Sequence, residues 1–199
     1  MLWGRRNLLP SGYGARLEGR LVYLRPPARI DYERWRDLRE SSRAFLTPWE
    51  PTWTADAHSR ANYLRRVKFA AEEWRTDQSY NFLIFRQADD ALVGGVTLGQ
   101  VRRGVAQTAS LGYWIGEPYA RRGYMTEALA CLIGYAFGEL GLHRIEAACL
   151  PHNEASRGLL AKLGFKEEGR AREYLRIDGR WQDHVLFALL ASDDWRRRR

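Results

Sequence analysis

The sequence predicts one α/β domain, built on a mixed central sheet of about seven strands flanked by four helices. Its 199 residues are 45% hydrophobic and 13% aromatic, which suits a packed core. Apolar residues alternate in some segments and recur every three or four residues in others. The resulting order is strand, two helices, three strands, helix, strand, helix, two strands. We expect a loosely ordered arm over residues 1–19, the domain over 20–195 and a basic tail over 196–199.

The first elements are a strand and a helix. Residues 21–25 have strand composition and stop at two prolines. Asp31 can cap a helix that carries Trp35 and Leu38 at a three-residue spacing. Residues 47–51 contain two prolines, which exclude a regular helix, and are expected to form a loop.

A long helix and three strands follow. The helix is expected to begin at Asp56 and to end near Trp74. Strands over 80–87 and 91–100 are joined by a short acidic turn, and a third covers 107–115. In this third strand the apolar side chains alternate, which places them on one face of the sheet.

The last third of the chain alternates helices and strands. An apolar helix follows a turn at 120–123, and Gly141 lies just past its end. We expect a strand over 143–150, a helix from Asn153 to Gly164, and two strands joined by a hairpin turn at 178–179.

The turn at residues 120–123 predicts an anion site. Gly123 and two arginines lie between the end of a strand and the start of the apolar helix. Such a turn directs several backbone N–H groups, and the positive end of a helix dipole, at one point. A glycine turn before a helix is by itself a weak signal, because many loops enter helices this way.

Several motifs in the right order resemble the GNAT acetyltransferases. The turn over 120–129 is followed by Asn-x-x-Ser-x-x-x-x-x-Lys-x-Gly-Phe within 151–165. The segments 45–51 and 174–185 look like the RimJ/RimL group, its RimJ branch above all, which acetylates the amino termini of ribosomal proteins. The resemblance covers residues 20 to 195 and implies the GNAT fold.

The resemblance implies acetyl-CoA as co-substrate, with its pantetheine arm along the backbone of Tyr113, Trp114 and Ile115. The pyrophosphate would lie on the N–H groups of Arg121, Arg122, Gly123, Tyr124, Met125 and Thr126. The family turn usually reads Gln/Arg-x-x-Gly-x-Gly/Ala. This chain departs from it at the first position, Ala120, and at the last, Met125, so the side chain that touches phosphate stays open.

Two residues at the second helix start are candidates for cofactor binding and catalysis. Asn153 suits a helix N-cap and, by the resemblance, also contacts the cofactor. Ser156 lies one turn further on, where its hydroxyl could protonate the leaving thiolate or simply bond to the backbone. The matching serine in RimL-type enzymes is the proposed acid.

The acceptor amine must be neutral before it attacks. An α-amino group with a pKa near 8 costs roughly 1.4 kcal/mol to neutralise at pH 7, against about 4.6 kcal/mol for lysine. A carboxylate is therefore a sufficient base. Glu173 lies where the RimL-type base falls, although an ion pair with a neighbouring arginine is the alternative. Glu50 is the second candidate, as a base or as a ligand of the acceptor amine, and Trp49 beside it is a candidate substrate-binding residue.

Composition excludes several classes of protein. No apolar run reaches the length of a membrane span, and residues 1–10 lack a signal-peptide core, so we expect a cytoplasmic protein. Cys131 and Cys149 are interpreted as small buried residues, and the four histidines are scattered, so no metal site is predicted. Residues 123–126 lack the Gly-Lys-Ser/Thr of a nucleotide-hydrolase phosphate loop.

Three functions remain open at this point. The first is a RimJ-like acetyltransferase of a protein amino terminus, with a ribosomal protein as acceptor and ribosome association. The second is a GNAT enzyme that acetylates a small amine. The third is a non-catalytic, RNA-associated assembly factor, since the formal charge is +8 and four of these charges lie in the terminal arginine run. Motifs 45–51 and 174–185 favour the first function.

Overall fold

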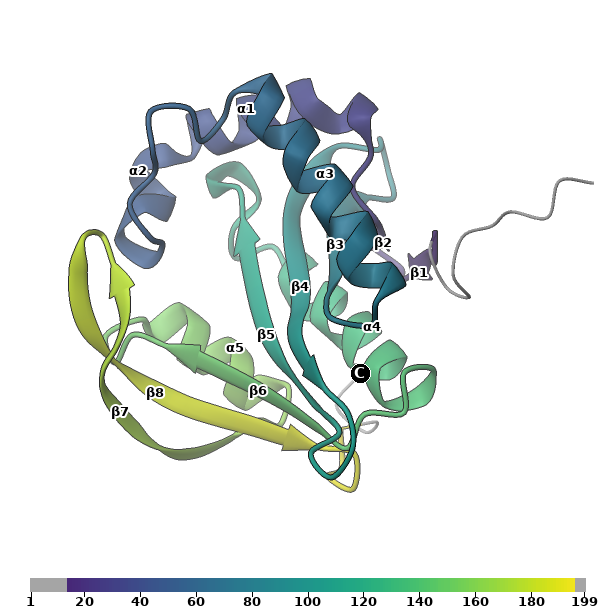
Figure 1. The fold of residues 1–199 in the computed structure, drawn as a ribbon, viewed down its shortest axis with the longest axis vertical. Helices are drawn as coiled ribbons and strands as arrows, with labels where there is room; N and C mark the ends of the chain where they lie inside the picture. The colour runs from purple at the N-terminus through teal and green to yellow at the C-terminus, as the bar shows by residue number, and fades with distance from the viewer. Residues whose placement is uncertain (1–13, 196–199) are drawn as a thin grey trace, which may run out of the picture.

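The computed structural model describes residues 14–195, which form an eight-stranded mixed sheet (Figure 1). The strand order is β1-β2-β3-β4-β5-β6-β8-β7, and every neighbouring pair is antiparallel except β5 and β6. The strands are β1 (Leu17–Glu18), β2 (Val22–Arg25), β3 (Tyr80–Arg86), β4 (Leu92–Arg102), β5 (Thr108–Ile115), β6 (Arg144–Cys149), β7 (Lys166–Ile177) and β8 (Arg180–Leu190).

Helices cover both faces of this sheet. The five α-helices are α1 (Tyr32–Ser41), α2 (Arg43–Leu46), α3 (Arg60–Arg75), α4 (Tyr124–Gly138) and α5 (Glu154–Lys162). Helices α1 and α3 lie over one face, and α4 and α5 lie over the other (Figure 1). Within residues 14–195, no helix has the length and apolar character needed to cross a membrane. The GNAT-like arrangement expected from the order of elements is present.

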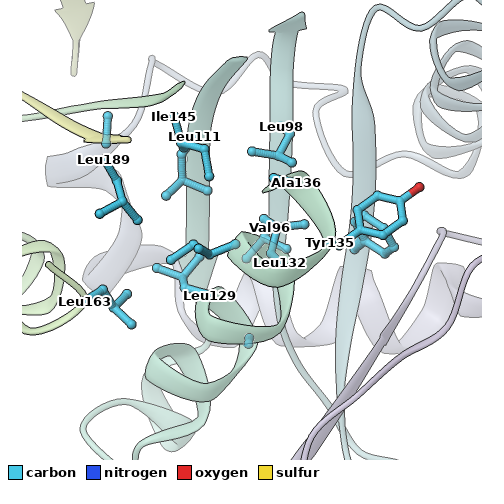
Figure 2. Packing of buried hydrophobic residues seen from close by; sticks show 14 of the residues in the cluster. Val96, Leu98, Leu111, Leu129, Leu132, Tyr135, Ala136, Ile145, Leu163 and Leu189 are labelled. Atoms are coloured by element: carbon cyan, nitrogen blue, oxygen red, sulfur yellow. The ribbon is translucent and has the colours of Figure 1, made fainter. Parts of the chain in front are cut away.

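The larger core lies between the sheet and α4. Val96 and Leu98 of β4 point toward Leu129 and Leu132 of α4, and all four side chains are buried (Figure 2). The apolar residues of α4 recur at three- and four-residue spacing, so they present one continuous face to the strands. This packing holds the start of α4 against the end of β5, where the predicted anion turn lies.

A carboxylate connects α4 to the chain before β2. Glu127, in the first turn of α4, accepts hydrogen bonds from the backbone N–H groups of Arg20 (3.0 Å), Leu21 (2.6 Å) and Val22 (3.0 Å). Bonds from amides to a charged acceptor are stronger than those between neutral groups. Glu127 therefore ties residues 20–22 to the helix that follows the anion turn.

Three local predictions differ from the structure. The long helix starts at Arg60 rather than Asp56, because the Ser59 side chain accepts a hydrogen bond from the N–H of Asn62 and caps it there. The proline loop contains a short 3-10 helix, Thr47–Trp49, directly after α2. The predicted arm contains β1, while residues 1–13 and the tail 196–199 lie outside the described residues.

We expect Glu127→Ala to lower the free energy of unfolding by about 3 kcal/mol, because three N–H groups lose a charged acceptor. Urea unfolding measures this change. Glu139→Ala, at the exposed end of the same helix, is the control and should shift stability by less than about 0.5 kcal/mol. Equal effects of the two substitutions would show that the tie contributes nothing.

Candidate active site

The site is built where β5 and β6 separate. Their parallel pairing runs from Thr108↔Arg144 to Leu111↔Ala147 and ends there. Beyond it β5 stays paired with β4 through Ile115, while β6 follows β8 to Cys149. The two strands diverge toward their carboxyl ends (Figure 1). Within the described sheet, the edge of residues 112–115 that faces β6 thus has no strand partner, and it can hydrogen-bond an extended ligand.

The anion turn lies directly beyond this edge. Gly123 has φ 85° and is the N-cap of α4, and Arg121 has φ 59°. Left-handed residues in such a turn direct successive N–H groups into one concavity. The first intrahelical bond runs from the N–H of Glu127 to the carbonyl of Gly123, so the N–H groups of residues 124–126 precede the helical ladder. Both arginines are exposed, beside N–H groups oriented for a phosphate.

Asn153 caps α5, as predicted. Its side-chain oxygen accepts a hydrogen bond from the N–H of Ser156 at 3.0 Å. The side-chain amide nitrogen remains available as a donor, so capping does not exclude contact with a cofactor. That contact stays a proposal.

Ser156 forms a hydrogen bond with a residue that the sequence did not indicate as its partner. Its hydroxyl lies 2.6 Å from the phenol oxygen of Tyr113, where either group can donate. Burial raises the pKa of Tyr113 to about 12, so the phenol keeps its proton at neutral pH. The hydroxyl also lies near the thiol of Cys149, whose pKa is raised by burial. The side chain of Tyr113 thus belongs to the site as well as its backbone.

Glu50 is engaged by other side chains. Its carboxylate forms a two-pronged ion pair with Arg39, with one bond of 2.7 Å, and accepts a bond from the indole N–H of Trp53 at 2.8 Å. The guanidinium of Arg39 lies over the rings of Trp53 (4.6 Å) and Trp114 (4.9 Å). This pairing occupies the carboxylate, so Glu50 fits a structural role better than a base.

The loop that carries Trp49 and Glu50 meets the β7–β8 hairpin and the start of α5. The N–H of Asp178 donates to the carbonyl of Glu50 at 2.9 Å. The ring of Trp49 lies 5.6 Å from that of His152. The structure therefore places Trp49 next to the start of α5, the helix that holds Ser156, and Glu50 next to the β7–β8 hairpin.

Glu173 lies on an exposed bulge of β7. Pairing with β8 is irregular between Ala171 and Leu175, and Glu173 there has φ 45°. Its N–H donates to the carboxylate of Asp183 at 2.9 Å. A non-glycine residue in the left-handed region costs about 1 kcal/mol or more, and such strain is concentrated at functional sites.

The two cysteines lie on α4 and at the end of β6. Cys149 is buried as predicted, whereas Cys131 on α4 is partly exposed, and within residues 14–195 neither cysteine forms a disulfide. Among residues 14–195 there is no group of three or more His, Cys, Asp or Glu side chains arranged to hold a metal ion.

Comparison with known proteins identifies the family. The model of the acetyltransferase (GNAT) domain matches residues 21–166. The chain belongs to the GNAT acetyltransferase family. It is 38% identical to the probable N-acetyltransferase YjcK of Bacillus subtilis, over 89% of this chain and 98% of that protein. It is 37% identical to the [ribosomal protein uS5]-alanine N-acetyltransferase of Escherichia coli, over 83% and 86%.

Solved structures resemble this GNAT enzyme over almost its whole length. Mycobacterium smegmatis RimJ in complex with CoA-disulfide aligns with a TM-score of 0.87 and 33% identity, covering 94% of each chain. The ribosomal-protein-S5-alanine acetyltransferase of Vibrio fischeri aligns with a TM-score of 0.84 and 29% identity, covering 91% of this chain and 98% of that one. The chain is therefore a GNAT-family N-acetyltransferase with the expected fold.

We expect Gly123→Glu to weaken acetyl-CoA binding by more than about 100-fold. A carboxylate about 4 Å from a phosphate is repelled by roughly 4 kcal/mol at an effective dielectric constant of about 20. Titration calorimetry measures the affinity. Gly123→Ala is the matched control, because it shares the left-handed backbone strain but adds no charge. If both variants bind equally, the turn does not hold the pyrophosphate.

Proposed function

We propose that this enzyme transfers the acetyl group of acetyl-CoA to the α-amino group of a protein amino terminus, with a ribosomal protein as acceptor. The observation that carries the proposal is the 37% identity, over 83% of this chain, to an acetyltransferase named for the alanine of ribosomal protein uS5. Action on a ribosomal protein implies a cytoplasmic enzyme that meets the ribosome or its free subunits.

The donor fits the open edge of β5. Acetyl-CoA would lay its pantetheine arm along Tyr113, Trp114 and Ile115, whose unpaired backbone groups can bond an extended amide chain. Its pyrophosphate would lie on the N–H groups of Arg121 to Thr126, and Asn153 would contact it from α5. The ternary complex then needs only direct attack by the amine.

Ser156 would protonate or stabilise the departing thiolate. Because the phenol of Tyr113 stays protonated, it can donate to the Ser156 oxygen, and the Ser156 hydroxyl hydrogen is then free for the sulfur. Charge develops on sulfur only as the tetrahedral intermediate collapses. The pair therefore acts mainly in the transition state.

Glu173 would accept the proton of the acceptor amine, directly or through one water. Its position on a strained, exposed bulge, anchored by Asp183, supports this role. A protein acceptor is further supported by large apolar side chains exposed on the same hairpin, namely Tyr174, Leu175 and Trp181. Exposed aromatic residues beside a catalytic loop suit a macromolecular partner better than a small amine.

Paired peptides test the proposed acceptor. One peptide has a free amino terminus and no lysine, and the other has a blocked amino terminus and one internal lysine. We expect acetylation of the first only, followed by mass spectrometry. Activity confined to the blocked peptide, or to a polyamine offered in parallel, would reject the proposal.

We expect Ser156→Ala to lower kcat by about 100-fold while the affinity for acetyl-CoA changes by no more than a few-fold. Steady-state kinetics and calorimetry measure the two quantities. Tyr113→Phe, which keeps the ring but removes the donor, should lower kcat by a smaller factor. Unchanged turnover of Ser156→Ala at saturating substrate would remove Ser156 from the mechanism.

We expect Glu173→Gln to slow acetylation about tenfold at pH 6.5 but by less than about twofold at pH 9. The sign follows from the amine: its pKa lies near 8, so it needs a base below that pH and is largely free above it. A pH profile with the free-amino peptide measures this. Glu167→Gln on the same strand is the control. A defect that does not change with pH would reject Glu173 as the base.

A further inference from the structure

The sheet carries a hollow on the face covered by α3. The pairings Asn81↔Thr97 and Thr97↔Gly112 place these three residues in one row across β3, β4 and β5. A Cβ added to Gly112 would meet nothing within 4 Å, so the row ends in open space. A cavity of about 370 Å³ is lined by Asn81 and Thr97 of this row, and by Arg66, Val67, Ala70 and Glu73 of α3 on its other side. Their spacing places them on one face of the helix.

This cavity adjoins the point where β5 and β6 separate. Gly112 directly follows Leu111, the last residue of β5 that pairs with β6. Trp114 contributes its backbone to the open edge and also lines the cavity. On the opposite face of the sheet, the side chain of Tyr113 is hydrogen-bonded to Ser156. The cavity on the α3 side therefore offers space for a second substrate beside this edge.

A directed chain of polar groups forms the floor of the cavity. The Thr97 hydroxyl donates to the side-chain oxygen of Asn81 at 2.8 Å. The amide nitrogen of Asn81 donates to the Ser79 hydroxyl at 3.1 Å and, at 3.4 Å, to the carboxylate of Glu73. An ionised carboxylate only accepts, so the Asn81 nitrogen must face Glu73 and its oxygen must face Thr97.

This chain fixes the role of the Thr97 oxygen. Its single hydrogen is used in the bond to Asn81, so the lone pairs that remain can accept from another donor. Thr97 is half-buried, while its neighbours Val96 and Leu98 are 2% and 0% exposed on the opposite face. Placing two polar side chains at the centre of a sheet costs free energy unless their hydrogen bonds are made. A spare acceptor there suits a ligand with an N–H group.

We propose that Thr97 accepts a hydrogen bond from the acceptor's amino group beside Gly112, with Asn81 and Glu73 as positioning residues. Thr97 and Gly112 are Cα partners on adjacent strands, which lie about 4.8 Å apart, so a group held over the face of Gly112 is within reach of the Thr97 side chain. One N–H directed at Thr97 leaves the nitrogen lone pair free for the acetyl carbon. The inference rests on the proposed function, because it requires an amine acceptor.

Thr97→Val tests the inference with an isosteric change that keeps the β-branched shape of the strand residue. We expect KM for the free-amino peptide to rise about tenfold, with kcat much less affected and the affinity for acetyl-CoA unchanged, while the Tm falls by a few degrees because Asn81 loses its donor. Thr97→Ser, which keeps the hydroxyl, should stay within about twofold of the wild type.

The positioning role of Glu73 needs its own pair of variants. Glu73→Ala removes the group that orients Asn81, so it should raise KM for the peptide, though less than Thr97→Val does. Glu72→Ala changes the exposed neighbour on the same helix and should leave KM unaltered. Equal increases of KM in the two variants would show that Glu73 acts only through its surface charge. That result would overturn its assignment as a positioning residue.

The outcomes separate this inference from the function on which it rests. A wild-type enzyme that acetylates the peptide, with an unchanged KM in Thr97→Val, would overturn the inference and leave the proposed function intact. Equal losses in Thr97→Val and Thr97→Ser would indicate packing rather than hydrogen bonding and would also overturn it. Failure of the wild type to acetylate any free amino terminus would reject both.

Discussion

The architecture depends on one interruption of backbone pairing, the end of the β5–β6 ladder after Leu111 and Ala147. Each strand keeps its other neighbour, β4 or β8, so the sheet stays continuous while one edge opens inside it. Unpaired peptide groups inside a fold are costly unless water or a ligand satisfies them. Leu111, where the β5–β6 pairing ends, packs in the same buried cluster as Leu129 of α4 (Figure 2).

The opening separates two kinds of chemistry by sheet face. Tyr113 and Ser156 lie on the face covered by α4 and α5, where we propose that a proton is delivered to the departing sulfur. Thr97 and Gly112 lie on the face covered by α3, where we propose that the acceptor amine approaches. Strand geometry produces this division, because successive side chains point to opposite faces. Neighbouring residues of one strand, such as Gly112 and Tyr113, can therefore face the acceptor amine on one side of the sheet and the departing thiolate on the other.

Local signals in the sequence predicted most of the fold and the anion turn. Gly123 before an apolar helix and Asn153 after a proline each carry their information within a few residues, and both act as N-caps. The predicted start of α3 was wrong because Asp56 and Ser59 are both residue types that cap helices well. Only the structure shows that Ser59 accepts the capping hydrogen bond, from the N–H of Asn62.

Contacts between segments that are distant in the chain could not be predicted from the sequence. The hydrogen bond between Tyr113 and Ser156 joins residues 43 positions apart, and no regular spacing in the sequence predicts it. No sequence signal pairs Arg39 with Glu50, yet Arg39 is largely buried and occupies the carboxylate of Glu50, the second candidate base. Thr97 is a polar residue within an apolar strand of the sequence, but residues of this kind usually face solvent. Its meaning depends on α3 lying above it.

The attachment of Glu127 to residues 20–22 has a practical consequence for handling the protein. The helix that begins at the anion turn is also the helix that anchors the start of β2, and Leu17 of β1 is buried against the same core. Shortening the chain into residues 17–22, or joining a fusion partner there, would therefore loosen a helix more than a hundred positions away in the sequence. Tags belong outside that boundary, or the loss of cofactor affinity will be mistaken for a damaged active site.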